Sequence, residues 1–170
     1  MHLRAATPAD VPALAGLGTD SFVDAFGTLY SPRDLAAFLN EHKTQAAFAA
    51  QLANPDSVFR LAEIDGMLGG YCKLGLSPGW PDQARGARVV SLHQLYVASR
   101  QTGRGVGAAL MDWAFAEAAT RAADEMQLSV WSGNHGAQRF YHRLGFTKIA
   151  EVTFRVGEQI DEEFLFAKRL

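Results

Sequence analysis

Three glycines at alternate positions, Gly103, Gly105 and Gly107, follow the apolar run 95–97 and precede an alanine-rich helical pattern. Glycines at a strand-to-helix turn let backbone N–H groups approach a ligand closely, because no Cβ intervenes. The first turn of the helix adds free N–H donors and the positive end of its dipole, which together favour an anion. The pattern therefore predicts a phosphate-binding turn, with a flexible turn that holds no ligand as the alternative.

The glycine spacing separates this turn from two common nucleotide-binding patterns. The dinucleotide pattern G-x-G-x-x-G would need its third glycine at 108, and no acidic residue ends a strand about 20 positions later. The Gly-Lys-Ser/Thr sequence of a nucleoside triphosphate loop is also absent. A protein that binds ATP or NAD through these glycines is therefore a weaker interpretation, although it stays open.

A second group of residues with chemical potential lies in the segment NHGAQRFYHRLGF, directly after the strand pattern 128–131. Asn134 stands just before a short helical pattern, where its carboxamide can cap the helix or reach a ligand. Helical spacing places four residues on one side of that helix, namely Ala137, Phe140, Tyr141 and Leu144. Taken alone, Tyr141 would be interpreted as a half-buried core aromatic.

The elements that must position these residues follow from periodicity and cap signals. Thr7 precedes a helical pattern as an expected N-cap, Ser31 repeats the same start signal, and Thr44 begins a third short pattern. The remaining predicted elements are a strand at 1–6, a hairpin at 57–76 that turns at Asp65-Gly66, a loop at 77–86, a strand at 87–97, a helix from 106, a helix at 136–144, and strands at 146–156 and 160–167. This order predicts a mixed sheet with helices on it rather than a regular βαβ repeat.

Composition limits the classes of function. A chain of 170 residues with 48% hydrophobic and 20% charged residues predicts one ordinary globular domain, spanning 1–170. The net charge is −2 and the basic residues form no run, which disfavours nucleic acid and anionic membrane as partners. The N-terminal residues lack a signal-peptide apolar region, and no run approaches the ~20 apolar residues of a membrane span. We therefore expect a cytoplasmic protein.

The chain has one cysteine, Cys72, in an apolar strand pattern. A single cysteine forms neither an internal disulfide nor a zinc cluster, and no metal site is implied. We interpret Cys72 as a small buried hydrophobic residue, with a reactive thiol as the alternative. Because it lies outside both motifs, no nucleophile for a covalent intermediate is evident.

Together, the stretch LYVASRQTGRGVGAALM and the later NHGAQRFYHRLGF resemble the GNAT superfamily of N-acetyltransferases. The first looks like the acetyl-coenzyme A pyrophosphate motif, and the second like the family pattern Asn-x-x-Ala-x-x-Phe-Tyr-x-x-x-Gly-Phe. The resemblance covers roughly residues 57–156. The segments 21–39 and 154–170 resemble, less specifically, a bacterial branch that includes spermidine/spermine N-acetyltransferases.

The resemblance implies an α/β (α+β) fold with a mixed, mostly antiparallel sheet of about seven strands flanked by helices. Its two central parallel strands would splay, and acetyl-CoA would lie in the gap where 95–97 and 128–131 separate. The backbone of the first strand would pair with the amide-rich pantetheine arm as an added strand does. The strand residues implied in this contact are Leu95, Tyr96 and Val97.

The same resemblance implies that the glycine turn holds the pyrophosphate through backbone N–H groups, with Arg104 and Arg100 adding charge. The turn residues concerned are Thr102, Gly103, Arg104, Gly105, Val106 and Gly107. The family usually has Gln or Arg where this chain has Thr102, so coenzyme binding is expected to be weaker unless Gln101 or Arg100 substitutes.

Two further roles follow from the resemblance. Asn134 would bond the pantetheine arm, and Tyr141 would lie near the thioester sulfur and protonate the departing thiolate. A phenol with an ordinary pKa of about 10 keeps its proton at neutral pH, which suits an acid.

The general base has more than one candidate. Many relatives have a Glu at the position that corresponds to Ser91, which is a poor base. We expect His93 to serve, on the same face as Ser91 and Leu95, with an ordinary pKa near 6.5. A packed strand histidine is the alternative interpretation of His93, and Glu63 with a water chain is another candidate base.

The acceptor would bind against the N-terminal helices, where the resemblance places Phe22, Phe26, Tyr30 and Asp34. The acidic residues Asp20, Asp24, Asp34 and Glu41 would favour a cationic amine such as a polyamine, although a solvated helix face explains them as well. Trp80 and the loop 77–86 would form a rim. A homodimer stays open.

The expected function is therefore transfer of an acetyl group from acetyl-CoA to a primary amine, of a small molecule or a peptide, by direct attack in a ternary complex. A coenzyme A-binding regulatory module without turnover is the alternative from another class. Retention of both Asn134 and Tyr141 argues against that alternative.

Overall fold

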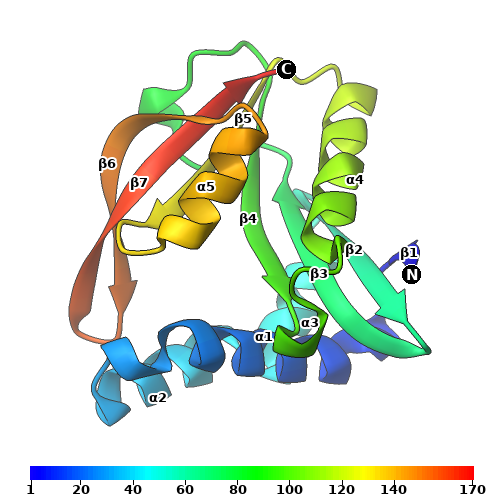
Figure 1. Cartoon of the computed structure of the whole chain (residues 1–170), viewed down its shortest axis with the longest axis vertical. Helices are drawn as coiled ribbons and strands as arrows, with labels where there is room; N and C mark the ends of the chain where they lie inside the picture. The colour runs from blue at the N-terminus through cyan, green and yellow to red at the C-terminus, as the bar shows by residue number, and fades with distance from the viewer.

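The computed structural model describes residues 1–170 and contains one seven-stranded sheet in the order β1-β2-β3-β4-β5-β7-β6 (Figure 1). Neighbouring strands are antiparallel except for β4 and β5, which are parallel. The strands are β1 His2–Ala5, β2 Ser57–Ile64, β3 Met67–Gly75, β4 Val89–Val97, β5 Glu125–Trp131, β6 Thr147–Val156 and β7 Gln159–Arg169. The predicted mixed sheet with one central parallel pair is confirmed.

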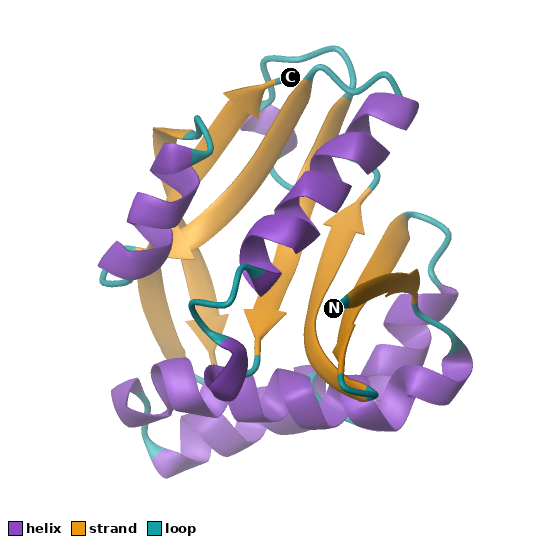
Figure 2. Cartoon of the chain, turned by 45° about the vertical axis from the view of Figure 1, so that its right-hand side comes forward, coloured by secondary structure: helices purple, strands orange, loops and turns teal.

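Five α-helices flank the sheet: α1 Val11–Phe26, α2 Pro32–His42, α3 Gln45–Ala53, α4 Val106–Thr120 and α5 His135–Arg143. Helices α4 and α5 lie on one side of the sheet, and α1, α2 and α3 lie together across its other side (Figures 1 and 2). We call these sides the α4–α5 face and the α1–α3 face. No helix is both long enough and apolar enough to cross a bilayer.

The helix starts follow the predicted caps. The Ser31 hydroxyl accepts from the Asp34 amide and the Thr44 hydroxyl from the Ala47 amide, so α2 and α3 begin where the sequence indicates. Thr7 begins a short 3-10 helix, Pro8–Asp10, which runs directly into α1. Local sequence signals therefore mark the starts of the 3-10 helix, α2 and α3.

One strand starts earlier than its sequence pattern predicts. The pattern indicated a strand at 128–131, whereas β5 begins at Glu125. Glu125 and Gln127 are polar and yet fully buried, because Arg85 and backbone groups of the loop at 77–86 bond to them. Because these buried residues are polar, the apolar pattern of the sequence does not show where β5 begins.

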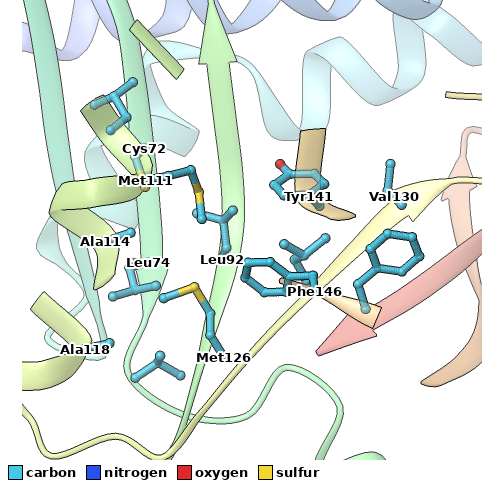
Figure 3. Packing of buried hydrophobic residues seen from close by; sticks show 14 of the residues in the cluster. Cys72, Leu74, Leu92, Met111, Ala114, Ala118, Met126, Val130, Tyr141 and Phe146 are labelled. Atoms are coloured by element: carbon cyan, nitrogen blue, oxygen red, sulfur yellow. The ribbon is translucent and has the colours of Figure 1, made fainter. Parts of the chain in front are cut away.

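The larger core cluster lies on the α4–α5 face, between the sheet and these two helices. Cys72 lies in it without solvent exposure, and burial raises the pKa of its thiol, as expected for a small hydrophobic residue. The predicted apolar side of α5 packs on the same cluster, and Figure 3 shows Tyr141 beside Phe146. A second cluster beneath α1 and α3 contains Phe48 and Tyr71.

Candidate active site

The two central strands pair over a short distance and then separate. Their parallel register joins Val89 to Glu125, Val90 to Met126 and Ser91 to Gln127, and it ends there. Beyond Ser91, the edge of β4 that faces β5 has no partner strand, and the two strands diverge towards α1 and α2 (Figure 1). The splayed pair inferred from the resemblance is therefore present, with unpaired main-chain groups along its β4 edge.

A bulge changes the faces of β4 within this unpaired stretch. Lys73 of β3 pairs with Gln94, and the next residue, Leu74, pairs with Leu92, so His93 is the extra residue. A bulge places one residue more on one strand and reorients the side chains beyond it. Leu92 and Leu95 consequently pack on the α4–α5 face, whereas Gln94 bonds Tyr71 on the α1–α3 face.

His93 itself lies on the α1–α3 face, beside Ser91. Its ring lies where a Cβ at Gly75 would stand, and both His93 and Ser91 approach Gly79. The prediction that His93 and Ser91 share a face is confirmed, but the prediction that Leu95 shares it is wrong. Strict alternation along the strand fails because the bulge intervenes.

The turn between β4 and α4 presents a group of backbone N–H donors without acceptors in the protein. Thr102 and Arg104 donate to the Ser99 and Gln101 carbonyls at 3.2 and 3.3 Å, and the first helical bond runs from Ala109 to Gly105. No side chain caps α4. The donors that remain free are the amides of Gly103, Gly105, Val106, Gly107 and Ala108.

The conformation of this turn requires two of its glycines. Gly103 and Gly105 have φ angles of +78° and +80°, the left-handed region in which a Cβ is strained. Gly105 is the N-cap of α4, so its conformation directs the following amides outward. The turn residues 102–105 are exposed, whereas the side chain of Val106 is buried in the core and anchors the helix start. Arg104 is exposed and bonds Gln101 at 3.0 Å.

Asn134 caps α5 and keeps a free donor. Its side-chain oxygen accepts from the Ala137 amide at 3.0 Å, which leaves its NH₂ group without a partner in the protein. The two alternatives for this residue, a cap or a ligand contact, are therefore compatible in the structure.

Tyr141 lies between the diverging strands. Figure 3 shows its ring between Leu92 of β4 and Val130 of β5, with the hydroxyl at the end remote from Phe146. The residue is 9% exposed and its hydroxyl makes no hydrogen bond to the protein, although it borders the cavity described next. Burial raises the pKa of the phenol, so it stays protonated at neutral pH.

A cavity of about 180 Å³ occupies the gap between the strands and is lined by residues from both faces of the sheet. The α4–α5 face contributes Leu92, Leu95, Leu128, Val130, Asn134, Ala137 and Tyr141. The α1–α3 face contributes His93, Gln94, Tyr96, Ser129, Trp131, Phe154, Asp161 and Glu163, together with Phe22, Phe26 and Tyr30. A ligand in this cavity would thus pass through the sheet.

The acidic residues of the cavity were missed from sequence. Asp161 and Glu163 lie at alternate positions of β7 and both face the cavity. Tyr30 donates to Asp161 at 2.6 Å, and the Ser129 hydroxyl donates to Glu163. A signal for them was present in the sequence. Asp161 and Glu163 share one face of β7 with Leu165 and Ala167, which are fully buried, and carboxylates are seldom found on a buried face unless they have a function or a partner.

The acidic residues expected on the helices lie elsewhere. Asp20, Asp24 and Glu41 are exposed and do not border the cavity. Asp34 accepts from the Glu158 amide, which fixes the β6–β7 turn to α2 and lowers the pKa of its carboxyl. The expectation that these residues meet the acceptor is therefore wrong, whereas Phe22, Phe26 and Tyr30 line the cavity as expected.

Two other residues predicted to contribute to the site, Glu63 and Trp80, also lie outside the cavity. Glu63 lies at the β1–β2 edge of the sheet, where it bonds Arg4 at 2.8 Å, so it is wrong as a candidate base. Trp80 does not line the cavity, and its backbone bonds the Gln127 side chain at 3.2 and 3.3 Å. The loop at 77–86 is tied to β4 and β5 by such bonds and does not form the expected rim.

His93 lies close to a lysine. The surrounding protein and the Lys73 ammonium lower the pKa of His93 to about 4, so its imidazole is neutral at pH 7 and can accept a proton. Ser91 is occupied, since its hydroxyl donates to the Ser77 carbonyl at 3.0 Å and accepts from the Gly79 amide. Of these two, only His93 offers a free basic atom to the cavity.

The fold and the site together define a class. The site combines free amides at a helix start, an unpaired strand edge, and a buried phenol in the cavity between the separated strands. Such an arrangement suits a long carrier with a phosphate group, an amide-rich arm and a reactive thioester, which is the chemistry of a coenzyme A-dependent acyltransferase.

Comparisons with known proteins agree with this class. The model of the Acetyltransferase (GNAT) family matches residues 22–146, and the chain belongs to this family. It is an acetyltransferase, and acetyl-CoA is the acyl donor of the family. An uncharacterised N-acetyltransferase of Mycobacterium tuberculosis is 32% identical over 162 residues, covering 95% of this chain and 98% of the relative. Another, from Lactobacillus delbrueckii subsp. lactis, is 28% identical over 165 residues, covering 95% of this chain and 92% of the relative.

Solved structures agree on the fold. PaiA N-acetyltransferase of Thermoplasma acidophilum, in complex with coenzyme A, has a TM-score of 0.80 at 18% identity, covering 99% of this chain and 98% of its own. A GCN5-related N-acetyltransferase of Rhodopseudomonas palustris has a TM-score of 0.80 at 21% identity, covering 99% of this chain and 95% of its own.

Proposed function

We propose that the protein transfers the acetyl group of acetyl-CoA to a primary amine, of a small molecule such as a polyamine or of a peptide, by direct attack in a ternary complex. The observation that carries this proposal is a single cavity that crosses the sheet, with the Tyr141 hydroxyl free inside it and five unbonded amides at the nearby start of α4. The donor would enter from the α4–α5 face and the acceptor from the α1–α3 face, and we call these the donor and acceptor entrances.

The donor would bind on the α4–α5 face. Its pyrophosphate would accept from the amides of Gly103, Gly105, Val106, Gly107 and Ala108, because these are the donors that the protein leaves unpaired. Thr102 and Arg104 would contribute their side chains, since their amides are engaged. The pantetheine arm would pair with the open edge of β4 at Leu95, Tyr96 and Val97, and the Asn134 NH₂ would bond its carbonyl. The relative from Thermoplasma is bound to coenzyme A, which supports this arrangement.

Tyr141 would act as the acid. The lone pair of the neutral amine attacks the thioester carbonyl carbon, the C–S bond breaks, and the thiolate takes the Tyr141 proton. A phenol whose pKa is raised by burial holds this proton until the thiolate forms. Its hydroxyl has no competing acceptor in the protein, so it is available to the sulfur.

His93 would accept the proton that the amine loses. Its neutral ring faces the α1–α3 entrance, where the amine would arrive. A base with a lowered pKa is weak, so a water molecule between amine and ring would carry part of the transfer.

Release of free thiol from acetyl-CoA tests the proposal, with diamines, polyamines, amino acids, aminoglycosides and peptide N-termini as acceptors. We expect thiol release that depends on both acetyl-CoA and an amine. Binding of acetyl-CoA without turnover across this panel would instead support the regulatory module. Titration with ATP and NAD separates the nucleotide-binding alternative, because the strand edge should favour coenzyme A.

A further inference from the structure

We propose that the α1–α3 end of the cavity selects an acceptor that carries a second cationic group, held by Asp161 and Glu163, and that the acceptor is a short aliphatic diamine. This inference rests on the proposed acetyl transfer and names its substrate class. It does not use the helical acids first expected to bind a cation, since those lie outside the cavity.

The charge of the cavity is unbalanced. Asp161 and Glu163 are its acidic residues, and no Lys or Arg lines it. Neither carboxylate forms a salt bridge in the protein. His93 is neutral at pH 7 and does not compensate them. Lys43 lies behind the Tyr96 ring and Lys73 lies near His93, but neither lysine forms an ion pair with these carboxylates. Two carboxylates without a paired cation, in a largely apolar cavity, favour a positively charged ligand.

The hydrogen bonds orient these carboxylates without neutralising them. Asp161 accepts from the Tyr30 hydroxyl at 2.6 Å and from the Gln159 side-chain Nε2 at 2.7 Å. Glu163 accepts from the Ser129 hydroxyl through one oxygen, and its other oxygen has no partner. All three donors are neutral. Burial and the neighbouring Asp161 raise the pKa of Glu163.

The surrounding walls suit an alkyl ammonium. Phe22, Phe26, Tyr30, Trp131 and Phe154 border this part of the cavity. Aromatic faces attract ammonium groups, most strongly where water is excluded, and they also pack against methylene groups. A hydrophilic acceptor such as a sugar would leave its hydroxyl groups unpaired against these rings.

The position and the size of the cavity set the length of the ligand. Tyr141 approaches from α5, whereas Asp161 and Glu163 belong to the α1–α3 face, so the reacting nitrogen and the second charge lie apart along one path. The volume of about 180 Å³ is well below the ~300–1,000 Å³ of ordinary ligand pockets. A short linear chain fits this space better than a folded peptide or an aminoglycoside does.

Calorimetric binding of 1,4-diaminobutane, compared with butylamine, tests the inference without requiring turnover. To protein saturated with coenzyme A, the diamine should bind at least about tenfold more tightly, since a charged hydrogen bond supplies that much. Asp161→Asn combined with Glu163→Gln should reduce this ratio to about one. Glu162→Gln, an exposed residue of the same strand, is the matched control and should keep the ratio.

The outcomes separate the inference from the proposed function. Equal binding of the two amines, or a ratio that survives the double substitution, would overturn the inference. Preferential binding of the diamine without thiol release would support the inference and contradict acetyl transfer to this amine. Thermal unfolding of the double variant monitors its fold, and removal of two uncompensated charges should leave the melting temperature equal or higher.

Discussion

The proposed donor and acceptor entrances are built in different ways. On the α4–α5 face the donors are main-chain amides, fixed by the left-handed Gly103 and Gly105 and by the start of α4. On the α1–α3 face the polar groups are side chains, and they come from β4, β5, β7 and the segment after α1. The first site depends on local conformation, whereas the second depends on how distant segments are registered. The donor side is therefore encoded locally in the sequence, whereas the acceptor side is encoded by long-range pairing.

The largest expected effect is on kcat and concerns Tyr141, which lies between the two entrances. Tyr141→Phe should lower kcat by about 10²–10⁴-fold, because the thiolate would leave without an acid. The dissociation constant of coenzyme A should change by less than about threefold, since the amides of the α4 turn remain. Steady-state kinetics and calorimetry measure the two quantities. A kcat close to that of the unsubstituted protein would remove Tyr141 from the acid role.

The second effect concerns a buried cation behind the acceptor entrance. Lys43 is 4% exposed, its Nζ lies 4.5 Å from the Tyr96 ring centre, and it forms no ion pair with a carboxylate. Burial lowers its pKa from 10.5 to about 8. The unfolded chain therefore binds this proton more tightly, so the free energy of unfolding should rise as pH increases from about 8 to 10.5.

Substitution of this lysine gives the corresponding test at neutral pH. Lys43→Met should raise the free energy of unfolding at pH 7 by up to about 3 kcal/mol, reduced by the lost contacts with aromatic rings. The substituted protein should also lose the rise in stability above pH 8. Denaturant unfolding at several pH values measures both, and a less stable variant at pH 7 would show that the ring contacts outweigh burial.

The third effect concerns the main-chain entrance. Gly105→Ala places a Cβ at a φ of +80°, which costs roughly 1–2 kcal/mol. We expect this strain to weaken coenzyme A binding and to lower the stability of the protein. The preference for 1,4-diaminobutane over butylamine should not change. Gly16→Ala is the control, because its Cβ would meet no atom within 4 Å in α1 and should stabilise the helix by roughly 0.5–1 kcal/mol. Equal coenzyme affinity in both variants would contradict a role for the turn.

The smallest expected effect is at the weak base. His93→Gln should lower kcat by about tenfold, because water continues to accept the proton. With its pKa lowered to about 4, His93 stays neutral well below pH 6, so its protonation should not limit the rate between pH 5 and 7. A rate profile that loses an inflection near 6.5 on substitution would show that the histidine titrates normally.

The sequence was most informative where a site depends on neighbouring residues. The glycine turn, the cap at Asn134 and the position of Tyr141 on α5 are each encoded within a few positions, and the element order follows from caps and periodicity. The strand bulge at His93 has no local signal, because it arises from the register between β3 and β4. This is why the face of Leu95 was predicted wrongly.

Residues that meet only through the sheet were the hardest to predict. Glu163 reaches the cavity because β7 pairs with β5 opposite Trp131, and Tyr30 reaches Asp161 across 131 positions of the chain. The helical acids had the correct charge but lay outside the cavity, and helical spacing alone does not show which face of a helix meets a cavity formed largely by later strands.

The most direct test of the account is an initial-velocity matrix for thiol release, in which acetyl-CoA and 1,4-diaminobutane are both varied. If the acetyl group crosses the split sheet directly from sulfur to nitrogen, the double-reciprocal lines should intersect, and no thiol should appear without the amine. Parallel lines, or a burst of thiol in the absence of amine, would show a covalent intermediate and would contradict direct transfer through the cavity.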